Sequence, residues 1–234
     1  MVSALHPTTA LVTGGSKGIG AGVATVLRSQ GVRVITAARS GADIAVDVAD
    51  PASVDALRQA VADRFGSLDL LVCSAGTLSV ARVVDLDPDE WDRVMAVNAR
   101  GVFLCARAFA PGMCERRRGS IVNVASIAGK RGEATLAHYA ASKFAVIGFT
   151  QALAAELAPF GVRANCVCPG VVASEMMDGL ARSWGETSSA VARRFQLLPE
   201  PQTVEEIGEA VWFLACSRSI TAQAINVDGG AVVG

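Results

Sequence analysis

Short apolar segments alternate with helical segments along the whole chain, and this alternation limits the possible folds more than any other feature of the sequence. The apolar segments have the length of β-strands, and several of them end at glycine. Strands are predicted at residues 9–15, 32–38, 42–48, 68–76, 119–126, 162–170 and 224–230. Helices are predicted at residues 20–31, 50–66, 88–115, 138–160 and 203–215. Because nearly continuous apolar strands need helices on both sides, we predict an α/β fold with a doubly wound parallel sheet.

The composition is that of one large globular domain. Of the 234 residues, 51% are hydrophobic and 18% are charged, and no linker divides them, so we predict a single domain over residues 1–234. The formal net charge of −1 gives no electrostatic basis for binding nucleic acid. The N-terminus lacks a signal-peptide pattern, and no uncharged apolar run is long enough to span a membrane. We therefore expect a cytoplasmic protein with no membrane partner.

The cysteines and histidines do not form a metal-binding pattern. The cysteines are at positions 73, 105, 114, 166, 168 and 216, and none belongs to a C-x-x-C pair. Only His6 and His138 could join them as nitrogen ligands. We interpret the cysteines as buried, reduced thiols and expect no metal site.

A glycine-rich loop, TGGSKGIG at residues 13–20, follows the first predicted strand and opens the first predicted helix. Gly14 permits a tight turn, Gly18 a close approach of the backbone, and Gly20 close packing of the helix on the strand. The free N–H groups at the start of the helix then face an anion. This context predicts a site for the pyrophosphate of a dinucleotide rather than a structural turn alone.

The segment HYAASKF at residues 138–144 contains the only tyrosine of the chain, Tyr139, with Lys143 four residues after it. This spacing places both side chains on one face of a helix. A phenol has a pKa of about 10, and a nearby ammonium group favours its ionised form. By itself the pair is typical of an ordinary helix surface. His138 points away from Tyr139 as its helical neighbour, and we predict that it lies on the surface or at the rim of the substrate site.

The motifs TGGSKGIG, VNARGVF, YAASK, CPGVVAS and INVDGG occur together in this order. The chain resembles the short-chain dehydrogenase/reductase family over almost its whole length, in particular its 3-oxoacyl reductase-like members. The resemblance implies a Rossmann-like fold and hydride transfer between NAD(P)(H) and a ketone or secondary alcohol. It implies cofactor contacts from Gly14, Ser16, Lys17, Gly18, Ile19, Gly20, Arg39, Asp47, Val48, Ala75, Gly76, Tyr139, Lys143, Pro169, Gly170, Val172 and Ser174.

The resemblance also assigns four catalytic residues. Tyr139 is the general acid in reduction and the general base in oxidation, and Ser126, thirteen residues earlier, orients and polarises the carbonyl. Lys143 lowers the pKa of Tyr139 and anchors the nicotinamide ribose. Asn98 completes the set by holding a water molecule beside the lysine.

The end of the second strand predicts NADP(H) in preference to NAD(H). An acidic residue there would bind the ribose 2′-hydroxyl of NAD, whereas an arginine accommodates the 2′-phosphate of NADP. The sequence has Ala38 at the position of the discriminating acid and Arg39 directly after it, and Lys17 adds a second cation. Asp43 follows closely and leaves NAD(H) open, because it could turn toward the ribose.

The segment at residues 174–203 is predicted to be a mobile lid over the substrate, with Met176 and Trp184 as substrate contacts. We expect the substrate to be a medium-sized ketone or a β-ketoacyl thioester that is reduced. Oxidation of a cyclic alcohol or dihydrodiol is the alternative, and a dinucleotide-sensing protein without turnover is an alternative of another class. The apolar content of the helices at 88–115 and 138–160 predicts a homodimer or homotetramer.

Overall fold

The computed structural model describes residues 6–233 as one α/β domain built on a single parallel sheet of seven strands. The strand order is β3-β2-β1-β4-β5-β6-β7. The strands are β1 Thr9–Thr13, β2 Arg33–Ala38, β3 Ile44–Ala45, β4 Leu70–Cys73, β5 Gly119–Val124, β6 Val162–Pro169 and β7 Ala224–Val227. The predicted Rossmann-like, doubly wound fold is confirmed.

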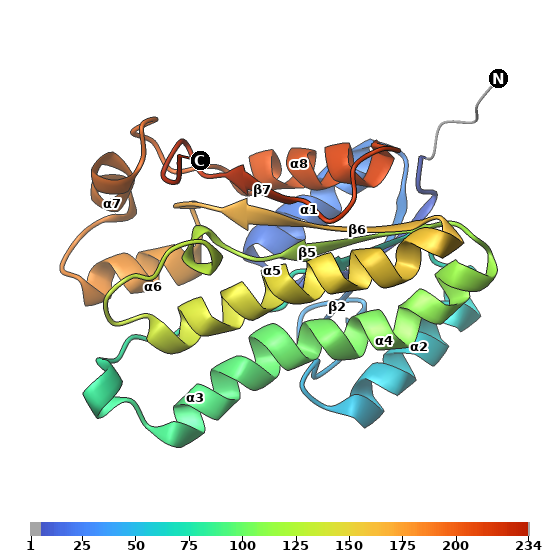
Figure 1. Ribbon diagram of the computed structural model, residues 1–234, viewed down its shortest axis with the longest axis horizontal. Coiled ribbons are helices and arrows are strands. Elements are labelled where there is room, and N and C mark those ends of the chain that lie inside the picture. The colour runs from blue at the N-terminus through green and yellow to red at the C-terminus, as the bar shows by residue number, and fades with distance from the viewer. Residues whose placement is uncertain (1–5, 234) are drawn as a thin grey trace.

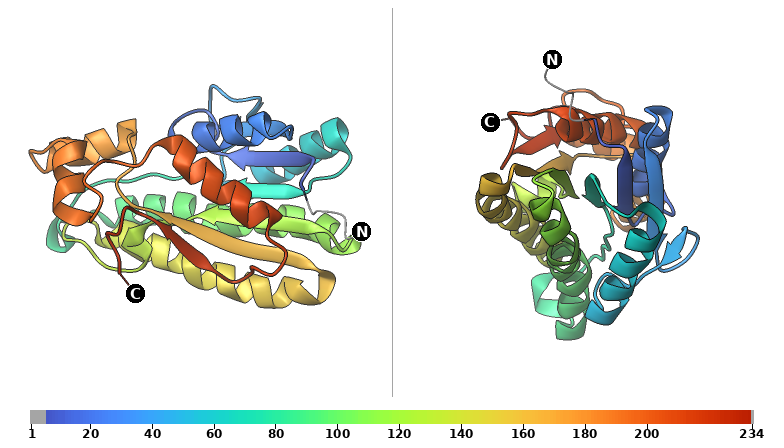
Figure 2. Two further views of the ribbon diagram at one scale, coloured as in Figure 1. Left: turned by 90° about the horizontal axis from the view of Figure 1, so that it is seen from above. Right: turned by 90° about the vertical axis from the view of Figure 1, so that its right-hand side faces the viewer.

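Two layers of helices cover the sheet (Figures 1 and 2). On one face α1 Gly18–Ser29 and α8 Val204–Cys216 pack against β1, β4, β5 and β6. On the other face lie α2 Pro51–Phe65, α4 Gly101–Glu115 and α5 Ala137–Leu157. Because the central strands β1, β4, β5 and β6 are buried from both sides, the core divides into two apolar clusters with the sheet between them, as the unbroken apolar strands require.

The third strand is shorter than predicted. Only Ile44 and Ala45 pair with β2, whereas the sequence pattern predicts a strand over residues 42–48. The side chain of Asp43 accepts hydrogen bonds from the backbone N–H and the hydroxyl of Thr36, both at 2.8 Å. The carboxylate therefore takes the β2 donor that a longer β3 would need, and the ladder begins one residue later.

The helix predicted at residues 88–115 contains an interruption. α3 Pro88–Met95 and α4 Gly101–Glu115 are joined by a π-helical turn, Ala96–Arg100, which includes Asn98. Such turns insert one extra residue into a helix and are frequent at functional sites. The turn changes the direction of the residues within it, which a regular helical period cannot show.

The chain between β6 and α8 forms two further helices, α6 Glu175–Ser183 and α7 Ser188–Phe195. Figure 1 shows them together at the end of the molecule toward which the strands point. They share a small apolar cluster of their own around Ala181 and Val191, separate from the two main clusters. Among residues 6–233, no helix has the length and hydropathy needed to cross a lipid bilayer.

Candidate active site

A cavity of about 630 Å³ lies at the carboxyl ends of β1, β4, β5 and β6, where the strand order reverses. Ligands of α/β sheets bind at this point of the fold. The cavity runs from the glycine loop to the lid helices α6 and α7. All predicted site residues except Asn98 line it: Gly14, Ser16, Lys17, Gly18, Ile19, Gly20, Arg39, Asp47, Val48, Ala75, Gly76, Ser126, Tyr139, Lys143, Pro169, Gly170, Val172, Ser174, Met176 and Trp184.

The glycine loop leaves room for an anion at one point only. A Cβ atom on Gly14 would lie 2.6 Å from Cα of Ala75, and one on Gly20 would overlap the carbonyl group of Gly14. Gly18 has φ +54°, and the space around its Cβ position is open within 4 Å. No side chain caps the first N–H groups of α1. An open space beside an uncapped helix N-terminus fits the pyrophosphate of a dinucleotide.

Lys17 bridges the cavity. Its Nζ lies 2.7 Å from Oε2 of Glu175, the first residue of α6. Both side chains are largely exposed, so the ion pair stabilises the fold little. It links the glycine loop to the lid, whereas the sequence alone suggests only a cation near the ribose phosphate.

The alternative that Asp43 turns toward the ribose does not agree with its contacts. Both hydrogen bonds from Thr36, followed by the more distant Arg28, lower the pKa of the Asp43 carboxyl. Asp43 does not line the cavity, whereas Ala38 and Arg39 do. At the end of β2, the charged side chain that lines the cavity is therefore Arg39 rather than Asp43.

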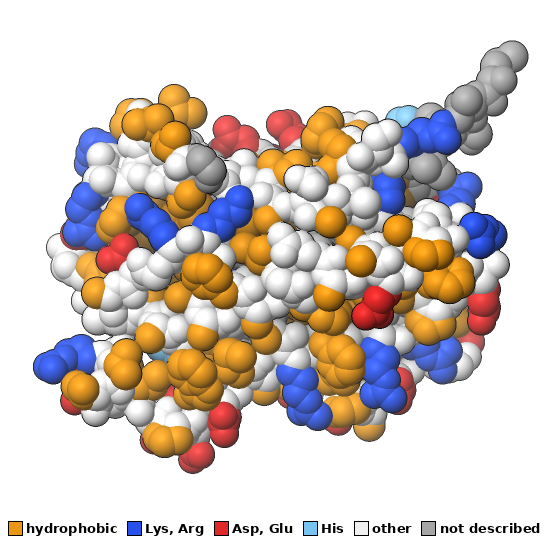
Figure 3. All heavy atoms as spheres, viewed as in Figure 1, with side chains coloured by type: hydrophobic (Ala, Val, Ile, Leu, Met, Phe, Trp, Pro, Cys, Tyr) orange, Lys and Arg blue, Asp and Glu red, His pale blue; other side chains and the backbone are white. Residues whose placement is uncertain are grey.

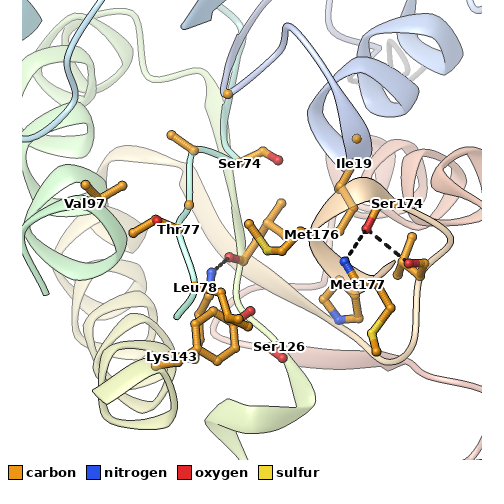
Figure 4. Close-up of a pocket in the computed structure, with 18 of the residues that line it drawn as sticks. Ile19, Ser74, Thr77, Leu78, Val97, Ser126, Lys143, Ser174, Met176 and Met177 are labelled. Atoms are coloured by element: carbon orange, nitrogen blue, oxygen red, sulfur yellow. Dashed lines mark hydrogen bonds between the residues drawn. The ribbon is translucent and has the colours of Figure 1, made fainter. Parts of the chain in front are cut away.

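Tyr139 and Lys143 lie one turn apart on α5 and face the cavity with Ser126. Lys143 Nζ donates a hydrogen bond to the Val124 carbonyl at 2.9 Å and lies 5.5 Å from the centroid of the Tyr139 ring. Figure 4 shows Lys143 and Ser126 across the cavity from Ile19 and the lid residues Ser174 and Met177. Three of the four predicted catalytic side chains are thus brought together by one strand end and one helix.

The pKa values of this group are set mainly by burial. Burial raises the pKa of the Tyr139 phenol, and a hydrogen bond with Ser126 partly offsets the rise. Burial also lowers the pKa of Lys143 from 10.5 to about 8. The expectation that Lys143 lowers the pKa of Tyr139 stays a prediction, because burial has the largest effect on that pKa in this geometry. At neutral pH the phenol carries its proton, as a general acid requires.

Asn98 lies behind the cavity wall and is fully buried. Its Oδ1 accepts a hydrogen bond from the Thr77 N–H at 2.8 Å, and its Nδ2 donates to the Thr77 carbonyl at 2.9 Å and to Ser142 Oγ at 3.0 Å. A Cβ atom on Gly76 would lie 3.5 Å from Asn98 Oδ1 and 3.7 Å from Lys143 Nζ. Gly76 therefore lies between the asparagine and the lysine, and its missing side chain keeps the space between them open.

The lid contributes an apolar wall. Ser174 caps α6, since its Oγ accepts a hydrogen bond from the Met177 N–H at 3.3 Å. The Trp184 and Phe195 rings lie 6.3 Å apart and join the two lid helices. Gln196 Oε1 accepts a hydrogen bond from the Val171 N–H at 2.9 Å, so the far end of the lid is tied back to its beginning. The predicted mobility of residues 174–203 stays a prediction.

Several cavity residues are missing from the sequence-based prediction: Thr77, Leu78, Arg93, Arg131, Leu136 and Phe195. Arg131 and Leu136 lie in the chain between Ser126 and Tyr139, and that position could have indicated them. Arg93 could not be found in this way, because only the packing of α3 against α5 brings it to the cavity.

The predictions for His138 and for the cysteines have different outcomes. The predicted surface or rim position of His138 is wrong, because its side chain is 0% exposed and bonds to Ser79. The helical face that turns away from the cavity is covered by the segment after β4 and by α3. The six cysteines are all free, and four of them are buried as predicted, whereas Cys114 and Cys216 are only half-buried. No cluster of potential metal ligands occurs among residues 6–233.

Comparison with known proteins gives the family of this chain. The family model described as short chain dehydrogenase matches residues 8–183. The chain belongs to this family. As a short-chain dehydrogenase, it is an NAD(P)-dependent oxidoreductase that acts on CH–OH groups or the corresponding carbonyls.

Similar members of the family cover nearly the whole chain. A protein named as a ketoacyl reductase of the monensin polyketide synthase, from Streptomyces virginiae, is 41% identical, with 94% of this chain and 95% of that protein aligned. The 3-oxoacyl-[acyl-carrier-protein] reductase FabG of Vibrio cholerae is 35% identical, with 97% and 98% aligned. The solved structure of ElxO with NADP bound has a TM-score of 0.89 at 25% identity, covering 96% of this chain and 98% of that chain.

Proposed function

We propose that this short-chain dehydrogenase reduces a medium-sized ketone or a β-ketoacyl thioester with NADP(H). The observation that carries the proposal is a buried, protonated Tyr139 beside Ser126 and Lys143, at the meeting point of the glycine-loop groove and an apolar lid. The reductase names of two relatives support this direction and this substrate class. When bound, the nicotinamide supplies the hydride.

The residues of the chain then have separate tasks. The Tyr139 hydroxyl donates its proton to the carbonyl oxygen as that oxygen gains charge. The Ser126 hydroxyl, within hydrogen-bonding range of the phenol, holds the same oxygen. The Lys143 ammonium, fixed by the Val124 carbonyl, stabilises the phenolate that the transfer leaves behind. Met176, Leu180 and Trp184 cover the substrate and exclude water.

A screen of carbonyl compounds tests the proposal. Purified protein is mixed with NADPH and with β-keto esters, β-ketoacyl thioesters or simple cyclic ketones, and the loss of reduced-nicotinamide absorbance is followed. We expect oxidation of NADPH with at least one β-keto compound. Turnover of cyclic alcohols or dihydrodiols alone would reverse the assigned direction. Cofactor binding without turnover of any compound would point instead to the dinucleotide-sensing alternative.

We propose NADP(H) rather than NAD(H) as the cofactor, because Arg39 and no acid lies at the end of β2. Replacing Ala38 by Asp together with Arg39 by Ala should lower the NADPH over NADH preference in kcat/KM by about 10–100-fold, as expected for a lost charge-assisted hydrogen bond of about 1.5–3 kcal/mol. Arg58→Ala removes an exposed arginine outside the cavity and should leave the ratio unchanged. A wild-type protein that prefers NADH would contradict the proposal.

We also propose a homodimer or homotetramer that associates through α4 and α5. Phe103 and Phe144 are 44% and 47% exposed on these helices, and Phe103 stacks edge-on against Phe149. Figure 3 shows hydrophobic side chains along this face. Phe144→Glu should halve the mass measured by light scattering at micromolar concentration, because a charge cannot be buried there unpaired. Phe213→Glu on α8, at 54% exposure, should leave the α4–α5 association intact. A monomeric wild type would contradict the proposal.

A further inference from the structure

His138 directly precedes Tyr139 in the chain, and the mechanism proposed above does not use its buried side chain. Its ring is 0% exposed, and Nε2 lies 2.7 Å from Ser79 Oγ. Nδ1 is also buried and has no hydrogen-bond partner among the described residues. Burying an imidazole with an unpartnered nitrogen costs free energy, and an apolar side chain could fill the same space without that cost.

The hydrogen bond continues from Ser79 into a charged pair on α3. A hydrogen bond with Ser79 contributes to the low pKa of the Glu90 carboxyl, after the larger effect of Arg93, and together they lower it to about 2. Arg93 binds this carboxylate through both Nε and Nη2, at 2.6 and 2.7 Å. Its remaining Nη1 donates to Thr77 Oγ1 at 2.9 Å.

The network therefore leads back to the segment after β4 and contacts it at two residues, Thr77 and Ser79. Ser79 is held by His138 and lies near enough to Glu90 to lower the pKa of that carboxyl, and Thr77 is held by Arg93 through its hydroxyl. The backbone of Thr77 is in turn the partner of Asn98, through both its N–H and its carbonyl group. Leu78, between the two held residues, lines the cavity.

The neighbouring carboxylate favours one tautomer of the imidazole. Because the ionised Glu90 can only accept, a Ser79 hydroxyl that turns its proton toward Glu90 leaves its oxygen to accept from Nε2–H of His138. Nδ1 then carries a lone pair and needs no acceptor. A second proton would have to sit at Nδ1, where no acceptor is present, so the network holds together only with a neutral imidazole.

We propose that His138 is a positioning residue, which locks the segment Thr77–Ser79 against the first turn of α5 and so fixes Asn98 and the Leu78 wall relative to Tyr139. His138 does not touch the reacting atoms in this role. It acts through Ser79, and it couples the geometry of the tyrosine-bearing turn to that of the asparagine behind the cavity. The inference concerns the site proposed above and rests on that function only for its kinetic readout.

The test compares the His138–Ser79 hydrogen bond, called the lock below, with a buried side-chain hydrogen bond elsewhere on α5. Ser79→Ala and His138→Leu each break the lock. Thr150→Val breaks the buried bond between Asn123 Nδ2 and Thr150 Oγ1, at 2.9 Å, which lies about three turns from Tyr139. His138→Gln can still present a donor near the position of Nε2. The measurements are kcat, KM for NADPH, thermal unfolding, and hydrogen exchange of the peptide containing residues 77–81.

We expect Ser79→Ala and His138→Leu to lower kcat by about 10-fold or more, with KM for NADPH changed less than 2-fold, and to speed exchange of the 77–81 peptide. Thr150→Val should lower the unfolding temperature by a similar amount and leave kcat and that exchange unchanged. His138→Gln should restore most of kcat. Equal effects of Ser79→Ala and Thr150→Val on kcat, or unchanged exchange of the 77–81 peptide in Ser79→Ala, would overturn the proposal.

The pH profile adds a readout that a purely structural histidine would not give. Burial and Arg93 lower the pKa of His138, while Glu90 raises it, and burial is the largest of these effects. The wild-type kcat should therefore fall on the acid side below pH 6.5, as the imidazole gains its proton and the lock opens. His138→Gln should lack this acid limb, and retention of the limb would count against the lock. If no carbonyl compound is turned over at all, the proposed function fails. Hydrogen exchange of the 77–81 peptide in the same variants still tests whether His138 holds this segment.

Discussion

Replacing Tyr139 by Phe should lower turnover by about 10²–10⁴-fold, which is the usual contribution of a general acid or base. The variant keeps the aromatic ring and its contact with Lys143, and loses only the hydroxyl that donates the proton. Binding of NADPH, followed by its fluorescence, should survive, since the glycine loop and Arg39 are unchanged. Near wild-type turnover in this variant would remove Tyr139 from the mechanism.

The single tyrosine of the chain allows a direct check of its protonation state. The absorbance of the phenolate near its ultraviolet maximum reports Tyr139 alone, and Tyr139→Phe supplies the blank. Because burial raises the pKa of this phenol, ionisation in the protein without cofactor should occur above pH 10. A phenolate signal already present at pH 7–8 would show that a nearby charge outweighs burial, contrary to the geometry found here.

Replacing Lys143 by Met should destroy activity and at the same time stabilise the fold. The ammonium is only 5% exposed, and its pKa of about 8 lies well below 10.5. This shift corresponds to about 3 kcal/mol of unfavourable interaction of the charged form at neutral pH. Part of the gain is offset by the lost hydrogen bond to the Val124 carbonyl. We expect a net stabilisation of about 1–2 kcal/mol, or several degrees in Tm, with turnover reduced by about 10²-fold or more.

The pH dependence of this stabilisation follows from the direction of the shift. The cost of the buried ammonium is present below the folded-state pKa of about 8 and disappears as pH rises toward the unfolded value of 10.5. The difference in stability between Lys143→Met and wild type should therefore shrink between pH 8 and pH 10.5.

Lys130→Met is the matched control, because Lys130 Nζ also donates to a backbone carbonyl, that of Ala224, at 2.7 Å, but does not line the cavity. It should lose stability and retain turnover. A Lys143→Met protein that is no more stable than Lys130→Met at pH 7 would contradict the burial argument.

The residues that line the cavity were predictable because their spacing within short motifs fixes their relative positions in the fold. A strand that ends at Gly14 and a helix that begins near Gly18 must place free N–H groups at the carboxyl edge of a parallel sheet. Four residues between Tyr139 and Lys143 must place both side chains on one helical face. The parallel sheet and the two covering layers of helices also followed, because apolar strands of this length have few other ways to be buried.

Where the prediction failed, the sequence did not show which distant segment packs against a given face of a helix. The sequence pattern leaves the face of α5 opposite the cavity open to solvent, and only the packing of α3 and the segment after β4 buries His138 there. In the same way, Lys17 meets Glu175, which lies 158 positions further along the chain.

The sequence by itself therefore determined the fold class and the family, and it placed the glycine loop and the Tyr139–Lys143 pair, because each depends on contacts within one turn or one strand–helix unit. Only the tertiary structure shows that Tyr139 and Lys143 are desolvated and that His138 is buried against Ser79. Desolvation depends on every segment that excludes water from a group, and those segments come from several parts of the chain that local spacing does not connect.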